Sequence, residues 1–188
     1  MTRRARGSRP EQEPRQPPDA EAALEIAARY LATRPRTRWE VERRLRRAGA
    51  ASDVVAATLE RLVGLGYVDD AAFVRWWVEQ RDRHNPRGRR MLEAELRQHG
   101  VPPRVIEAMR EELAAPERPA GGEPLPASDE ERAREALERH LRGRPVPDDP
   151  KALQRLGAYL VRRGFGPETA RRALRHTATH GDLSDGPG

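Results

Sequence analysis

The feature that most limits what this chain can fold into is a helical pattern that recurs before three glycines. The glycines are Gly49, Gly100 and Gly164. Four residues before each glycine lies a leucine (Leu45, Leu96 and Leu160), and eight residues before each lies another apolar residue (Val41, Leu92 and Leu156). Side chains spaced by four residues share one face of an α-helix, and glycine often follows a helix C-terminus. The pattern therefore predicts three equivalent amphipathic helices, each ended by its glycine.

Residue patterns typical of helix N-termini occur before and between these glycines. Thr37 and Glu40 have the spacing of a capping box, and Ser128 and Glu131 repeat it. No segment alternates apolar and polar residues in the way a half-buried strand would. Nine helical patterns in matching order predict an all-α protein of three tandem three-helix repeats, which pack as an elongated, curved array. The predicted ranges are a disordered basic arm (1–18), repeat 1 (19–65), repeat 2 (66–115), a Pro/Gly linker (116–127), repeat 3 (128–180) and a disordered tail (181–188).

The stretch from residue 64 to residue 100 contains the clearest of these helices. Asp69 and Asp70 stand where a helix N-terminus favours an oxygen acceptor and negative charge, an interpretation we prefer to an acid–base or metal site. The Asn85-Pro86 pair predicts that the next helix starts there, with asparagine as the cap and proline in the first position. Trp76 and Trp77 point about 100° apart on a helix. We therefore expect one tryptophan in the core and the other in a groove or an interface.

Composition excludes several functional classes. The chain has no cysteine, so disulfides and thiolate chemistry are absent. His176 and His180 are four residues apart but lack a third ligand at a useful spacing, so we expect no metal. No phosphate-binding glycine loop and no catalytic signature is present, so we expect neither an enzyme nor a cofactor. No apolar run approaches the length of a membrane span. We expect a cytoplasmic monomer that does not contact a membrane.

Charge is the property that points to a partner. The chain carries 36 Lys and Arg against 30 Asp and Glu, a formal net charge of +6, and all but one of the basic residues are arginine. Eight arginines and only two glutamates lie between Arg29 and Arg47. Ion pairs within a helix cannot neutralise them all. A basic first part of the chain favours a polyanion or an acidic protein surface as the partner.

The central residues resemble a known family. The run from Gly66 to Asp70, followed by Phe73, Arg81, Gly88, Arg90, Leu96 and Gly100, resembles the RecX regulatory proteins of bacteria. The earlier run from Pro35 to Arg38, with Glu40, Leu45 and Gly49, is similar to that family's first module. The resemblance extends over about residues 20–176. The linker at 116–127 and the basic arm are longer than the family pattern, which leaves the docking of the third module open.

The resemblance implies a negative modulator of the RecA recombinase. Members of that family bind the RecA–DNA filament and suppress strand exchange, ATP hydrolysis and co-protease activity, and they thereby restrain homologous recombination, DNA repair and the SOS response. The implied partners are the RecA filament on DNA and, by direct contact, single- or double-stranded DNA. Its fold, a set of tandem three-helix repeats, agrees with the pattern of caps and glycines.

Two groups of site residues follow from these patterns. The residues expected to contact the filament or DNA are Arg43, Arg44, Arg47, Arg81, Arg87, Arg89 and Arg90. The residues expected to support the structure as family-motif positions are Tyr67, Asp69, Asp70, Phe73, Leu96 and Gly100, with Tyr67 packed inside the central module. Two alternatives stay open: a helix-turn-helix transcriptional regulator that binds DNA, and an adaptor that binds acidic peptides.

Overall fold

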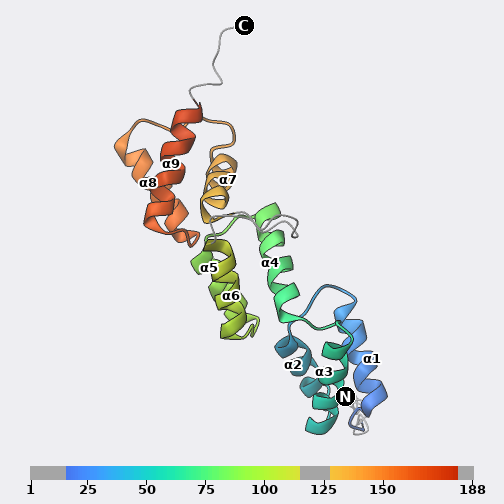
Figure 1. The fold of residues 1–188 in the computed structure, drawn as a ribbon. Helices are drawn as coiled ribbons and strands as arrows, with labels where there is room; N and C mark the ends of the chain where they lie inside the picture. The colour runs from blue at the N-terminus through green and yellow to red at the C-terminus, as the bar shows by residue number, and fades with distance from the viewer. Residues whose placement is uncertain (1–15, 115–127, 182–188) are drawn as a thin grey trace, which may run out of the picture.

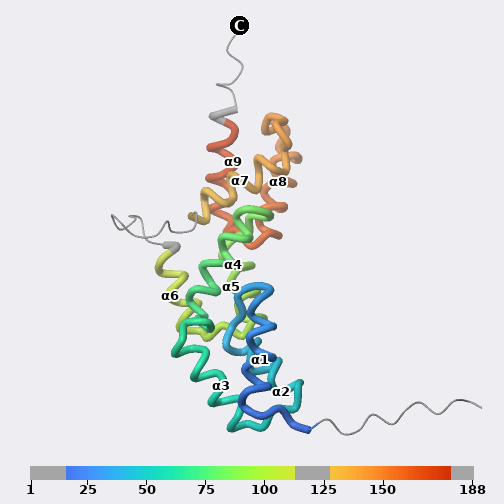
Figure 2. The backbone as a smooth tube through the Cα atoms, turned by 90° about the vertical axis from the view of Figure 1, so that its right-hand side faces the viewer, coloured from blue at the N-terminus to red at the C-terminus, as the bar shows by residue number. Residues whose placement is uncertain are grey.

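The computed structural model describes residues 16–114 and 128–181, and these residues form nine α-helices and no strand. They follow one another as three groups of three along an elongated array, with α1 and α9 at opposite ends (Figures 1 and 2). The predicted arm, linker and tail lie almost entirely outside the described residues. None of the described helices is both long and apolar enough to span a membrane. The helices are α1 (Ala20–Leu31), α2 (Arg38–Arg47), α3 (Ser52–Gly64), α4 (Asp70–His84), α5 (Arg89–Gln98), α6 (Pro103–Ala114), α7 (Asp129–Leu141), α8 (Pro150–Arg162) and α9 (Pro167–Gly181).

Local capping interactions start most of these helices where the sequence predicts. Both capping boxes form, at Thr37 with Glu40 and at Ser128 with Glu131. The Asp69 carboxylate accepts hydrogen bonds from the first free N–H groups of α4, at 2.8 and 3.1 Å. Each bond satisfies an amide that has no partner inside its own helix. The interpretation of Asp69 as a helix cap is therefore confirmed.

The predicted start of α5 is wrong. The helix begins at Arg89 with Gly88 as its N-cap, and Asn85 and Pro86 lie in the preceding loop. The N–H of Gly88 donates to the carbonyl oxygen of Arg163 at 3.0 Å, while the carbonyl of Pro86 accepts from the Arg163 side chain. These contacts span more than seventy residues of sequence, so the loop conformation is set by the third module and not by its own cap signal.

The apolar positions that recur before the glycines form the core. The leucines four residues before each glycine are 0% exposed, and the residues eight positions before are 0 to 7% exposed. Gly49, Gly100 and Gly164 all have positive φ angles, between 71° and 89°. Such angles suit glycine because it has no Cβ to clash with the backbone. Each module therefore has its own small core, ended by the predicted turn.

Two predictions about aromatic packing are wrong. Tyr67 is 67% exposed and does not pack inside the central module. The next residue, Val68, is buried instead at 3% exposure and packs in the core of the first module, and Asp69 after it has an extended backbone. Neighbouring side chains in an extended segment point to opposite sides, so only one of the two can enter the core. Trp76 and Trp77 are both half-buried, and Phe73, at 1% exposure, occupies the centre.

Consecutive modules join through the same hydrogen-bond arrangement. The first residue of α4, Asp70, accepts from the N–H of Arg38 at the start of α2, at 2.9 Å. The first residue of α7, Asp129, accepts from the N–H of Arg89 at the start of α5, also at 2.9 Å. Each carboxylate therefore satisfies a free helix amide of the preceding module. The shared design places successive modules end to end and accounts for the elongated shape.

Candidate interaction surface

The outer face of α2 carries an arginine stripe. Trp39, Arg43, Arg46 and Arg47 line a shallow groove together with Glu42. Their spacings of three and four residues place them on one side of the helix. The stripe exists because the other side of α2 is required for the core, where Val41 and Leu45 are fully buried. We refer to Trp39, Glu42, Arg43, Arg46 and Arg47 as the α2 face.

Much of the positive charge on α2 is not neutralised. Arg46 pairs with Glu42 at 2.9 Å. The guanidinium of Arg43 lies 4.9 Å from the centre of the Trp39 ring, a cation–π contact that orients the side chain without removing its charge. Among the described residues, no carboxylate pairs with Arg43, Arg44 or Arg47, and all three are exposed. They can therefore reach an external anion.

Trp39 is a part of this face that the sequence prediction omitted. Its side chain is 40% exposed, although a tryptophan is usually covered. The ring also covers Gly100, where an added Cβ would lie 2.4 Å from the Trp39 Cγ. The signal was present in the sequence, because Trp39 and Arg43 are four residues apart on a predicted helix. Trp39 thus links the exposed arginines to the junction with the second module.

Two of the predicted contact residues belong to an internal ion cluster. Arg81 and Arg87 both pair with the buried carboxylate of Glu95, and the Trp77 indole N–H donates to it at 2.9 Å. Arg81 also lies over the Trp77 ring, 4.3 Å from its centre. Burial lowers the pKa of Arg81 and, with repulsion from Arg81 and Arg163, that of Arg87. These two arginines are held inside the second module by their shared bonds to Glu95.

The other two predicted arginines of the second module differ from each other. Arg89 is tied to the junction through its N–H, and its guanidinium lies 3.9 Å from Glu93. Glu93 itself is held by Arg110, and this bond is the main reason that its pKa is lowered. Arg90 is exposed and, in the part of the chain that the structure describes, has no carboxylate partner. Arg90 therefore remains available for binding, like the arginines of α2.

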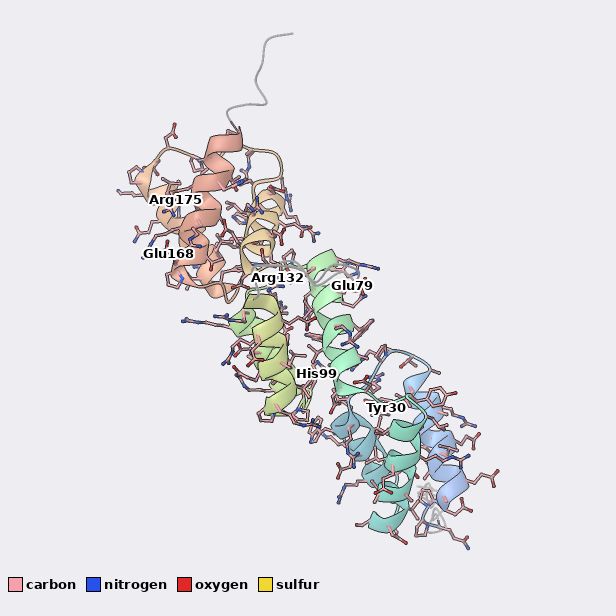
Figure 3. All side chains as sticks on the ribbon, in the orientation of Figure 1. Tyr30, Glu79, His99, Arg132, Glu168 and Arg175 are labelled. Carbon is pink, nitrogen blue, oxygen red and sulfur yellow. The ribbon has the colours of Figure 1, made fainter. Side chains whose placement is uncertain are left out.

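A buried carboxylate connects the α2 face to the second module. Glu40 pairs with Arg34 at 2.8 Å and lies 3.1 Å from a ring nitrogen of His99, which is labelled in Figure 3. Burial acts to raise the pKa of Glu40, but the bonds from Arg34 and from the Thr37 N–H outweigh it, so the pKa is lowered. The hydroxyl of Thr37 also donates to the carbonyl oxygen of His99 at 2.6 Å. The orientation of α2 is thus fixed by groups from both modules.

The predicted motif residues gather around this junction. Asp69 caps α4, and Asp70 receives the N–H of Arg38. Phe73 and Leu96 are core residues of the second module. Within the described residues, no group of three or more His, Cys, Asp or Glu side chains could hold a metal ion. The arrangement can bind anions through guanidinium groups, and its motif residues keep that surface in place.

Comparison with known proteins identifies the architecture. Models of the first, second and third three-helix domains of RecX match residues 23–62, 69–109 and 128–174. The chain is 33% identical over 168 residues to the regulatory protein RecX of Mycobacterium sp. (strain KMS), covering 87% of this chain and 84% of the relative. It is 35% identical over 170 residues to the regulatory protein RecX of Thermobifida fusca (strain YX), covering 85% and 84%.

A solved structure confirms the fold independently. The crystal structure of RecX from Lactobacillus salivarius superposes with a TM-score of 0.68 at 17% sequence identity, covering 88% of this chain and 97% of that one. At that identity the likeness establishes the all-α, three-module fold. With three domain models matched in order and curated relatives covered over most of their length, the chain belongs to the RecX family of regulatory proteins.

Proposed function

We propose that this protein restrains the RecA recombinase by binding the RecA–DNA filament. Family membership supplies the regulatory role, and the resemblance of the motif residues supplies the partner. The observation that carries the proposal is the set of exposed arginines on α2, Arg43, Arg44 and Arg47, which have no carboxylate partner among the described residues. Guanidinium groups bind phosphates and carboxylates through paired hydrogen bonds. A filament of protein on DNA offers both kinds of anion.

The elongated array suits a repetitive partner. Its three modules are joined end to end (Figure 2), so separate modules can contact successive units of a filament. Contacts that are weak individually add strongly once the first has formed, because the others then act at a high effective concentration. In this mechanism the bound array blocks a second DNA strand or the addition of RecA subunits. Suppression requires occupancy and no catalytic side chain.

The proposal assigns different roles to the predicted arginines. Arg43, Arg44, Arg47 and Arg90 contact the filament, because they are exposed and have no carboxylate partner within the described ranges. The remaining three, Arg81, Arg87 and Arg89, position the second module through the ion pairs and the backbone bond described above. Replacing Arg87 with a glutamate would set it against Glu95 and disturb the core, so such a variant is unsuited as a test of binding.

The test is the ATPase rate of RecA on single-stranded DNA as this protein is titrated in. We expect inhibition well below one molecule per RecA subunit. The variant Arg43→Gln/Arg44→Gln/Arg47→Gln should need about tenfold more protein, at roughly 0.5 kcal/mol for each exposed contact. The matched control is Arg61→Gln/Arg75→Gln/Arg104→Gln, which removes the same charge from other exposed, carboxylate-free positions.

The outcomes separate the proposal from its alternative. Equal inhibition by the triple variant and the wild type would reject the α2 face as the contact. Absence of any effect on RecA at several-fold excess, together with tight binding to one duplex sequence, would instead establish a transcriptional regulator. If the control variant lost inhibition of the RecA ATPase to the same extent, net charge and not the position of the arginines would account for the effect.

A further inference from the structure

A second basic surface lies where the end of α4 meets the third module. Two adjoining open grooves, of about 490 and 540 Å³, share His140, Arg144 and Tyr159 in their walls. The sequence prediction placed no contact residue here. The first groove is lined by His84, Asn85, Pro86, Ala136, Arg139, His140, Arg142, Arg144, Tyr159 and Arg163. The second groove adds Arg155 and Arg162. We refer to the pair as the α7–α8 track.

No aspartate or glutamate among the described residues lines either groove. Six arginines do, and among the described residues Arg142, Arg144, Arg162 and Arg163 have no carboxylate partner. Arg139 pairs with Glu135, and Arg155 lies 4.0 Å from Asp149. A concave surface lined by charges of one sign concentrates the electrostatic potential and attracts ions of the opposite sign. The track is therefore an anion-attracting groove.

Backbone carbonyls orient several of these arginines without neutralising them. Arg163 donates from Nε and Nη2 to the carbonyl oxygen of Pro86, at 3.1 and 3.0 Å. Arg144 donates from Nε to the carbonyl oxygen of Leu141 at 3.0 Å. A carbonyl is a neutral acceptor, so each guanidinium keeps its full charge and its other N–H donors. Side chains held in this way lose less conformational entropy when an anion binds.

The track also contains an aromatic pair. The His140 ring stacks on the Tyr159 ring, with centroids 4.0 Å apart and planes inclined by 25°. The Tyr159 hydroxyl donates to the carbonyl oxygen of Ala136 at 3.3 Å, which fixes the position of the pair. His140 is exposed, so the stack presents a ring at the groove surface. Rings beside a line of arginines form the combination that binds single-stranded nucleic acids through bases and phosphates together.

We propose that the α7–α8 track binds the phosphodiester backbone of a single nucleic-acid strand, with a base stacked on His140. Arginine forks match the geometry of phosphate oxygens. Two adjoining grooves suit an extended chain, and the exposed His140 ring suits a single strand, because its bases are free to stack whereas those of a duplex already stack on each other. The proposal is independent of the proposed function, because it requires no RecA. It also predicts that binding needs modules two and three to be docked, since both contribute to the walls.

The test uses the full-length chain, a short fluorescein-labelled oligothymidylate and a duplex of equal length, with binding followed by anisotropy over a series of salt concentrations. The variant is Arg142→Asn/Arg144→Gln. Arg142 has a left-handed backbone (φ 52°), which asparagine adopts readily. The matched control, Arg61→Gln/Arg75→Gln, removes the same charge from exposed positions in the first two modules. Circular dichroism and urea midpoints establish that both variants fold.

We expect the track variant to reduce the slope of log K against log salt by about 1.4, since each phosphate contact to a single strand contributes about 0.7. At about 0.1 M salt this corresponds to a loss of affinity on the order of 25-fold. The control should bind like the wild type. His140→Ala should weaken single-strand binding without changing the salt slope, because stacking releases no counter-ions.

The proposal would be overturned by an unchanged salt slope in the track variant, by an equal loss of affinity in both variants, or by tighter binding of the duplex than of the single strand. Competition by polyglutamate as strong as by oligothymidylate would also overturn it and would assign the track to an acidic peptide. The RecA ATPase assay on the same variants is a separate readout. Loss of inhibition there bears on the proposed function, whereas the anisotropy measurement decides the track.

Discussion

Replacing Gly88 with alanine should separate the third module from the second. A Cβ at Gly88 would lie 2.2 Å from the carbonyl carbon of Gly164 and from the backbone nitrogen of Phe165. Non-bonded carbon atoms pack at about 3.5–4.0 Å, so the two backbones would have to move apart by more than an ångström. The φ angle of Gly88 is −71°, which alanine adopts without strain. Any loss of stability therefore reports packing at the junction alone.

The size of the effect follows from the contacts that the movement breaks. Overpacking a close contact costs about 1–3 kcal/mol. The hydrogen bond from Gly88 to Arg163 and the bonds from Arg163 to Pro86 add about 1 kcal/mol for each bond lost. With one to three of these bonds lost, the total of about 2–6 kcal/mol is large beside the roughly 5–15 kcal/mol that stabilises a typical domain. We expect the third module to undock and, without that support, to unfold at a lower denaturant concentration than the other two.

Two spectroscopic signals distinguish the modules during urea unfolding. All three tryptophans (Trp39, Trp76 and Trp77) lie in the first two modules, so their fluorescence follows those modules. Far-ultraviolet circular dichroism follows helices in all three. In Gly88→Ala we expect the dichroism to develop an earlier transition while the fluorescence midpoint stays near the wild-type value.

The control is Gly64→Ala, at the end of α3, where an added Cβ meets no atom within 4 Å. Alanine at a helical position stabilises by up to about 1 kcal/mol relative to glycine, so this variant should unfold no earlier than the wild type. Coincident dichroism and fluorescence transitions in Gly88→Ala, at the wild-type midpoint, would refute the account of the junction.

Two further predictions concern charged groups at the junctions. Arg132 is 0% exposed and lies between Asp129, at 3.1 Å, and Asp82, at 3.8 Å, where α7 meets α4 (Figure 3). Arg132→Met should lower the free energy of unfolding in urea by about 3–5 kcal/mol, because it removes the cation that both carboxylates contact. A loss below about 1 kcal/mol would contradict this role. Although burial acts to raise the pKa of Glu40, hydrogen bonds including that from Arg34 lower it overall. As pH falls, the unfolded chain therefore binds a proton at Glu40 before the folded chain does. The stability that ionised Glu40 contributes is complete above the ordinary glutamate pKa of 4.5 and is lost as pH falls through the lowered pKa of the folded protein. In Glu40→Gln we expect a weaker dependence of the urea midpoint on pH below about 5 than in the wild type, and identical dependence in the two proteins would rule out the ion pair as its source.

The local architecture of this protein was determined by its sequence. Helix caps such as Thr37 with Glu40, and the glycines that end α2, α5 and α8, act over three to five residues, so their consequences can be worked out from spacing alone. The same holds for the core positions of those helices, because periodicity decides which side of a helix is apolar. Repetition of these signals was enough to predict three modules of three helices.

Only the tertiary structure decided which charges are available and where the modules meet. Arg81 and Arg87 resembled surface residues, yet both pair with the buried carboxylate of Glu95 on α5. The N-cap of α5 is Gly88 and not Asn85, because the N–H of Gly88 donates to the carbonyl oxygen of Arg163 in the third module. The α7–α8 track likewise joins residues near 84 and near 160. Contacts between positions this far apart depend on how whole helices pack, and no short-range pattern in the chain encodes them.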